Sequence, residues 1–149
     1  MKKAESQVEM RNAYMIDLQV HNRANIISSE DAVFACQFGY SQDDERDEEF
    51  YYSTVVLGMK YSVGSDNSDE IAYEIECEFG IRLRTVINDE NDFIAPKEFL
   101  LQVGVTNLIG TIRARLGAVC GSLELTPPFH LPLFNAVELI DNMKNKEPK

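Results

Sequence analysis

The sequence has few cysteines, and their spacing fits neither of the two usual structural roles. Cys36, Cys77 and Cys120 are odd in number and include no CxxC pair. Such a set argues against a secreted disulfide framework and against a zinc site. Each cysteine lies among apolar neighbours, so we expect three buried free thiols in a reducing compartment.

The chain is also poor in positive charge and has no long apolar run. Fourteen Lys and Arg residues stand against 25 Asp and Glu residues, a net charge of −11. This surface repels phosphate backbones and anionic lipids, so nucleic acids and membrane surfaces are poor partners. The acidity favours basic or mixed partners, or serves solubility alone. Because no signal-peptide pattern and no spanning stretch occur, we expect a cytoplasmic protein without direct membrane insertion.

Residues that carry catalysis are scarce. A catalytic site needs a nucleophile with a base, a carboxylate pair in a cleft, or metal ligands. The two histidines, His21 and His130, have no Cys, Asp or Glu at metal-ligand spacing, and no GxGxxG or P-loop pattern occurs. We therefore expect no enzyme, no cofactor and no metal.

Period-two alternation dominates the first half of what we expect to be a single domain of 149 residues with flexible ends at 1–10 and 144–149. Four alternating segments cover residues 14–21, 32–40, 51–63 and 73–84. In the first, Tyr14, Leu18 and Val20 share one face and Asp17 lies on the other. Alternation of this kind is typical of half-buried antiparallel strands. The acidic run at 41–49 cannot be buried and predicts a solvated hairpin loop.

A helical period replaces the alternation after the fourth strand. Pro96 suits the first turn of a helix, and residues 97–116 carry apolar side chains at steps of three and four, namely Leu101, Val105, Leu108, Ile112 and Leu116. Pro132 opens a last helix. The order predicts an α+β domain, with a four-stranded antiparallel sheet and both C-terminal helices packed on one face.

Two apolar sets exceed what one face of a sheet can cover. On the reverse face of the third strand, Phe50, Tyr52 and Val56 predict an exposed groove that binds extended polypeptide clients.

The second apolar set lies on the long helix. It comprises Phe99, Val103 and Ile109, beside Gly104 and Gly110, which permit close approach. This surface predicts an oligomer interface about a two-fold axis. The alternative is that the last helix covers it within one subunit.

Three glutamates on the fourth strand form the one charged constellation that stands out. Alternation places Glu74, Glu76 and Glu78 on one face, with neighbours roughly 7 Å apart. Lys60 on the third strand is a candidate cross-strand partner. The row is either a solvated strand face or an acidic platform for a basic partner.

Three stretches of the second half carry a family resemblance. They are AYEIECEFGIRLRTV at 72–86, the helical segment 96–117 that ends in Arg-Leu-Gly, and LELTPPFHLPLF at 123–134. In order, spacing and proline corner they resemble the protein-export chaperone SecB. The resemblance implies a four-stranded antiparallel sheet, a dimer of dimers, and a hydrophobic groove that holds unfolded chains without ATP.

The resemblance also implies roles for individual residues. Asp17, Glu74 and Glu76 fall where the family places the face that meets the translocase motor, and Glu78 extends that face. His21 stands where the family has an acid, and the tail MKNKEPK is short and basic where the family's is long and polar to acidic. Other SecB-like proteins guard the antitoxin of a toxin–antitoxin pair. We therefore expect a homodimer or homotetramer that holds preprotein or antitoxin clients, or alternatively an adaptor with one specific partner.

Overall fold

The computed structural model describes residues 8–87 and 95–146 and has the expected α+β class. Its strands are β1 (Val8–Met10), β2 (Tyr14–Asn22), β3 (Ala32–Arg46), β4 (Phe50–Ser65) and β5 (Ile71–Val86), followed by the helices α1 (Pro96–Ser122) and α2 (Ala136–Lys146). The described residues thus form five strands, which corrects the predicted four.

The extra strand arises because the first edge of the sheet is broken in two. The order is β1-β5-β4-β3, and β2 also pairs with β5. Val8–Met10 lies antiparallel to residues 83–85, and Tyr14–Asn22 lies antiparallel to residues 73–80. Val8–Met10 is therefore part of the sheet, contrary to the expected flexible end at 1–10, of which residues 1–7 lie outside the described part.

A β-bulge in β2 changes the face of one aromatic side chain. The register shifts between Met15 and Asp17, so that Tyr14 lies opposite Gly80 and Asp17 opposite Glu78. Tyr14 therefore shares a face with Asp17, and the prediction that placed it with Leu18 was wrong. A Cβ at Gly80 would lie 2.6 Å from Cζ of Tyr14, so the bare backbone makes room for the ring.

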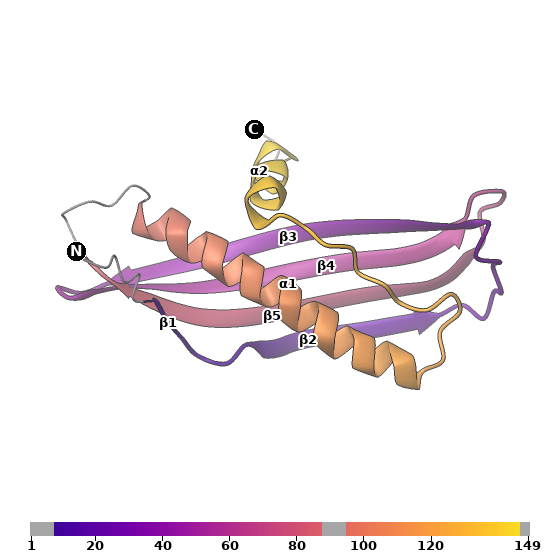
Figure 1. Ribbon diagram of the computed structural model, residues 1–149, viewed down its shortest axis with the longest axis horizontal. Coiled ribbons are helices and arrows are strands. Elements are labelled where there is room, and N and C mark those ends of the chain that lie inside the picture. The colour runs from indigo at the N-terminus through magenta and orange to yellow at the C-terminus, as the bar shows by residue number, and fades with distance from the viewer. Residues whose placement is uncertain (1–7, 88–94, 147–149) are drawn as a thin grey trace, which may run out of the picture.

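Helix α1 lies across one face of the sheet and closes the core (Figure 1). The whole predicted helical stripe is buried, at Leu101, Val105, Leu108, Ile112 and Leu116. It packs in one apolar cluster with the alternate residues of β4 and β5. The helix continues to Ser122, beyond the expected end at 116. Among the described residues, no helix is both long and apolar enough to cross a membrane.

The chain between the helices is fastened to the sheet by polar contacts. The Tyr73 hydroxyl donates to the Pro127 carbonyl at 2.7 Å, and the Tyr61 hydroxyl donates to the His130 carbonyl at 3.1 Å. The Asn135 side chain then accepts the Val137 backbone N–H at 3.0 Å. This cap makes α2 begin at Ala136, not at Pro132 as expected.

Helix α2 packs on the same side of the sheet as α1. Ile140 and Met143 are buried in the common core, and Phe134, which precedes the helix, stacks edge-on against Phe38 of β3 at 5.1 Å. Lys144 belongs to the helix and pairs with Glu98 at 3.0 Å, so residues 144–146 are helical, contrary to the expected flexible end at 144–149. Residues 147–149 lie outside the described part.

The acidic run is mostly strand, because β3 extends to Arg46 and leaves a short turn at 47–49. The expected loop at 41–49 was therefore too long. Two alternate residues of this run, Gln42 and Asp44, contact polar groups beneath the start of α1. Gln42 donates to the Ser53 hydroxyl at 2.7 Å, and that hydroxyl donates to Asp44 at 2.8 Å. Ser53 is 1% exposed, so these bonds satisfy a buried hydroxyl that would otherwise be costly.

Candidate binding surfaces

The four acidic residues that the sequence predicts as a partner-binding surface do share one face of the sheet, the face that the helices leave uncovered. Pairing between strands aligns Gly39, Gly58, Glu78 and Asp17 in a single row from β3 to β2. The two glycines leave the row bare at one end and the two acids fill the other. The result is a hollow of about 520 Å³ whose lining includes Asp17, Glu76 and Glu78.

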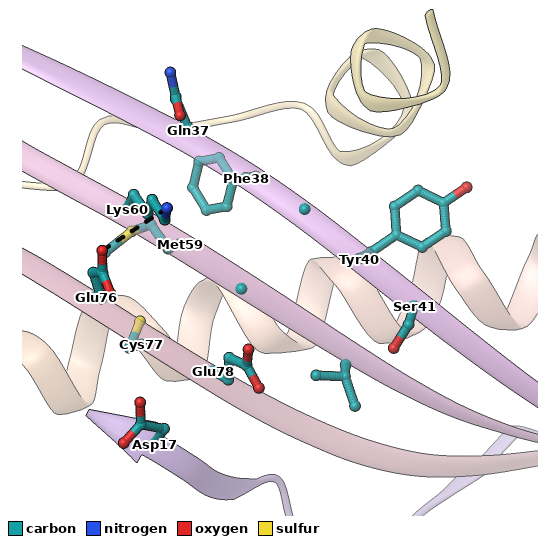
Figure 2. Close-up of a pocket in the computed structure, with 13 residues that line it drawn as sticks. Asp17, Gln37, Phe38, Tyr40, Ser41, Met59, Lys60, Glu76, Cys77 and Glu78 are labelled. Carbon is teal, nitrogen blue, oxygen red and sulfur yellow. Dashed lines mark ion pairs between the residues drawn. The ribbon is translucent and has the colours of Figure 1, made fainter. Parts of the chain in front are cut away.

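Cations neutralise only part of this acidic patch, which we define as Asp17, Glu74, Glu76 and Glu78. Arg23 pairs with Glu74 at 2.7 Å. Lys60 pairs with Glu76 at 3.9 Å, and Figure 2 marks this second ion pair with a dashed line. Within the described residues, Asp17 and Glu78 form no ion pair. The patch can therefore attract a basic surface, and docking there stays a prediction.

The residues predicted as a client groove lie on the same helix-free face, where the rings of Phe50 and Tyr52 are neighbours. Val56 borders the hollow. The Phe50 ring lies 4.2 Å beneath the Arg84 guanidinium, and the Tyr52 ring lies 5.6 Å beneath that of Arg82. Such cation–π stacking covers ring faces that a client would otherwise use. Client binding by these residues stays a prediction.

A second groove, lined by apolar and polar side chains, lies on the other side of the molecule, between β3 and α2. We call it the edge groove. Its volume is about 480 Å³, and it is lined by Cys36, Gln37, Phe38, Leu133, Phe134, Asn135, Glu138, Leu139, Asn142 and Met143. In Figure 1, α2 stands beside the outer edge of β3, on the side away from β4.

Apolar side chains remain exposed around the edge groove. Leu133, in its wall, is 90% exposed, and Phe34, two residues before Cys36 on the same face of β3, is 49% exposed. Burial raises the pKa of the Cys36 thiol to about 11, so this wall presents a neutral, weakly polar sulfur at physiological pH. The groove therefore offers apolar surface without competing charge on its β3 side.

The predicted oligomer surface on α1 is less exposed than its sequence suggests. Ile109 is only 4% exposed within the single chain, whereas Phe99 and Val103 are half-buried. Gly104 faces the sheet, where a Cβ would lie 2.9 Å from Cγ2 of Val55, and does not present a surface for a second helix. Only Phe99 and Val103 of the three predicted residues have area left for a partner, and their interface stays a prediction.

Nothing in residues 8–87 and 95–146 brings metal ligands together. No group of three or more His, Cys, Asp or Glu is placed to hold a metal ion in this part of the chain. The His130 carbonyl fastens the connection to Tyr61, and His21 lies opposite Glu74 in the sheet.

Sequence reasoning missed the edge groove, although one signal pointed to it. Leu133 and Phe134 lie between Pro132 and the cap at Asn135, outside the helix, where they flank a strand. The sequence gives no means of knowing that this strand is β3. That pairing depends on where the connection after α1 returns across the sheet.

The comparisons with known proteins find similarity in structure alone. No protein-family model matches the chain, and no curated protein matches its sequence. Among solved structures, the Mycobacterium tuberculosis SecB-like chaperone Rv1957, in complex with a ChAD peptide from the Rv1956 HigA1 antitoxin, is similar with a TM-score of 0.65. Identity is 14%, over 85% of this chain and 90% of that one.

A second solved structure is a protein of unknown function from Streptococcus agalactiae. It has a TM-score of 0.50 and 16% identity, over 88% of this chain and all of that one. At these identities the likeness concerns the fold alone. The chain therefore has a fold similar to that of a SecB-like chaperone.

Proposed function

We propose that this protein holds unfolded polypeptide segments in the edge groove, as an ATP-independent chaperone for preprotein or antitoxin clients. One observation carries the proposal: a groove with six apolar side chains among its ten lining residues lies open beside exposed Leu133 and Phe34. Exposed apolar surface of this kind marks a site of interaction. The fold similarity to a chaperone bound to an antitoxin peptide supports the same class of client.

The size of the groove suits weak, reversible holding. Burying one Leu or Phe side chain gains about 1.5–3 kcal/mol, so two or three client side chains supply roughly 3–9 kcal/mol before the entropic cost of binding. Net affinity then falls at micromolar values or weaker. Such affinity lets a client leave without nucleotide hydrolysis.

Aggregation of a chemically denatured model protein tests the proposal. We expect the wild-type protein at equimolar ratio to slow light scattering, and Leu133→Ser to lose most of this effect. Val137→Ser is the matched control, because Val137 is 46% exposed on α2 but does not line the groove. If the wild-type protein leaves aggregation unchanged, the proposal is wrong.

The acidic patch favours a second candidate, an adaptor that docks one folded basic partner. Like charges on adjacent strands destabilise a sheet, so their presence at Asp17 and Glu78 suits a role in binding. A pull-down would recover one stoichiometric partner, and Glu76→Lys with Glu78→Lys would lose it while the fold persists. Binding to unfolded model proteins with the patch reversed would instead favour the chaperone.

A further inference from the structure

The edge groove runs along an unpaired strand edge. β3 lies at one end of the sheet and pairs only with β4 among the described strands. Along its 15 residues every second residue directs its backbone N–H and C=O away from β4. Cys36, Gln37 and Phe38 all border the groove. Successive side chains alternate between the two faces, so a groove that all three border includes the edge between them.

This edge lacks the sequence features that usually block edge pairing. Natural edge strands are blunted by Lys, Pro or a bulge, or are covered by a helix, and here the groove of about 480 Å³ lies between the edge and α2. β3 pairs with β4 without a register shift over its whole length, and residues 32–41 contain no proline and no charged residue. Ten successive residues of β3 thus form a regular, uncharged template. α2 stands beside it as a second wall.

We infer that a client segment enters the edge groove as an added β-strand, paired to β3 through its backbone. The inference rests on the proposed function and specifies its binding mode. Backbone pairing gives affinity without sequence specificity, and alternate side chains of the segment enter the space under α2. The occupant is an extended segment of alternating apolar residues that carries one Lys or Arg.

Glu138 supplies the reason for the basic residue. Glu138, Leu139 and Asn142 lie at helical spacing on the face of α2 that lines the groove, next to the capping residue Asn135. Glu138 is the one charged residue of that lining, it is exposed, and it forms no ion pair with any other described residue. A client cation at this point completes the charge complementarity.

Peptides with methylated backbone nitrogens test the strand addition. The probe is a fluorescent peptide of about seven residues, a usual strand length, in which Thr alternates with Val, Phe and one Lys, so that the Lys shares the face of the apolar side chains. Two versions carry N-methyl groups on alternate sets of amides. Only one set faces β3, so we expect that version to bind on the order of tenfold more weakly and the other to bind like the parent. Equal affinities of the two versions would overturn the inference.

Charge reversal on α2 tests the role of Glu138. We expect Glu138→Lys to lower the affinity for the Lys-containing peptide about fivefold, and to raise the affinity for a peptide with Glu at that position. Asp141→Lys is the control, since it makes the same change on an exposed α2 residue outside the groove. Equal effects of the two variants would show that the charge acts only at long range and would remove Glu138 from the site.

These outcomes are separable from failure of the proposed function. A protein that suppresses aggregation but does not distinguish the methylated peptides remains a chaperone, one that holds clients by side chains alone. A protein that does neither loses both proposals.

Discussion

Gly104 provides the sharpest test of how α1 lies on the sheet. It is buried, and a Cβ there would stand 2.9 Å from Cγ2 and 3.1 Å from Cβ of Val55. The latter atom is fixed to the backbone of a central strand, so it cannot swing aside. Gly110, six residues along the same helix, is exposed and has nothing within 4 Å of its would-be Cβ.

The two Gly→Ala substitutions should therefore differ in sign. Both gain the helix propensity of alanine, about 1 kcal/mol over glycine. At Gly110 nothing opposes this gain, so we expect the free energy of unfolding to rise by about 0.5–1 kcal/mol. At Gly104 the overpacking penalty of about 1–3 kcal/mol outweighs it, so we expect no gain or a loss of up to about 2 kcal/mol.

Urea unfolding followed by circular dichroism, at one protein concentration, measures both changes. A fixed concentration is needed because any assembly would add to stability. Gly117→Ala serves as a second control, since Gly117 is equally open. A Gly104→Ala variant as stable as Gly110→Ala would mean that α1 does not lie as close to Val55 as described.

Three further predictions concern single side chains. Tyr73→Phe should cost about 1–2 kcal/mol in urea unfolding, because the Pro127 carbonyl loses its buried donor. The Cys36 thiol, with its pKa raised to about 11 by burial, should be alkylated slowly at pH 8 and faster up to about pH 11, and saturation with peptide should slow it further. Hydrogen bonds from the Phe50 and Glu49 backbone lower the pKa of Asp47 below 3.8, so its contribution to stability is complete above that pH and is lost as the pH falls through the lowered pKa. Unfolding of Asp47→Ala and wild type should therefore converge in acid.

The central strands and the long helix were predictable because their patterns follow directly from burial. Alternation on β5 separates the buried Tyr73 and Ile75 from the glutamates, and the same period holds on β4. The stripe on α1 was equally clear. In both cases one face packs against the core along the whole element, so the sequence carries the period without interruption.

The edges of the sheet were not predictable in the same way. Tyr14 changes face because of the bulge beside Ile16, and a bulge adds one residue without a composition signal. Asp44 lies in a strand despite its charge, because Ser53 and Lys97 partner it beneath α1. These outcomes depend on contacts between segments distant in sequence.

Sequence predicts a binding surface correctly where the alternation within one strand decides which residues share a face. The common face of Glu74, Glu76 and Glu78 follows from period two, and Asp17 joins it by pairing with Glu78. The edge groove depends on which strand α2 meets. That contact is set by the connection at 123–135 and by its anchors on Tyr61 and Tyr73.

Assembly through α1 is the remaining prediction, and the structure narrows it to Val103. Ile109 has almost no exposed area left, so a partner helix would contact the half-buried Val103 and the open backbone at Gly110. A charged side chain at position 103 would lose its water in such an interface and would find no opposite charge there. In a single chain the same side chain would still reach water. We therefore expect Val103→Glu to dissociate a wild-type oligomer in sedimentation velocity while its circular dichroism spectrum is unchanged. Thr106→Glu, on an exposed position one turn further, shows whether the interface extends along the helix. A wild-type protein that sediments as a monomer at micromolar concentration would contradict the prediction, and would mean that the cover provided within the chain is sufficient.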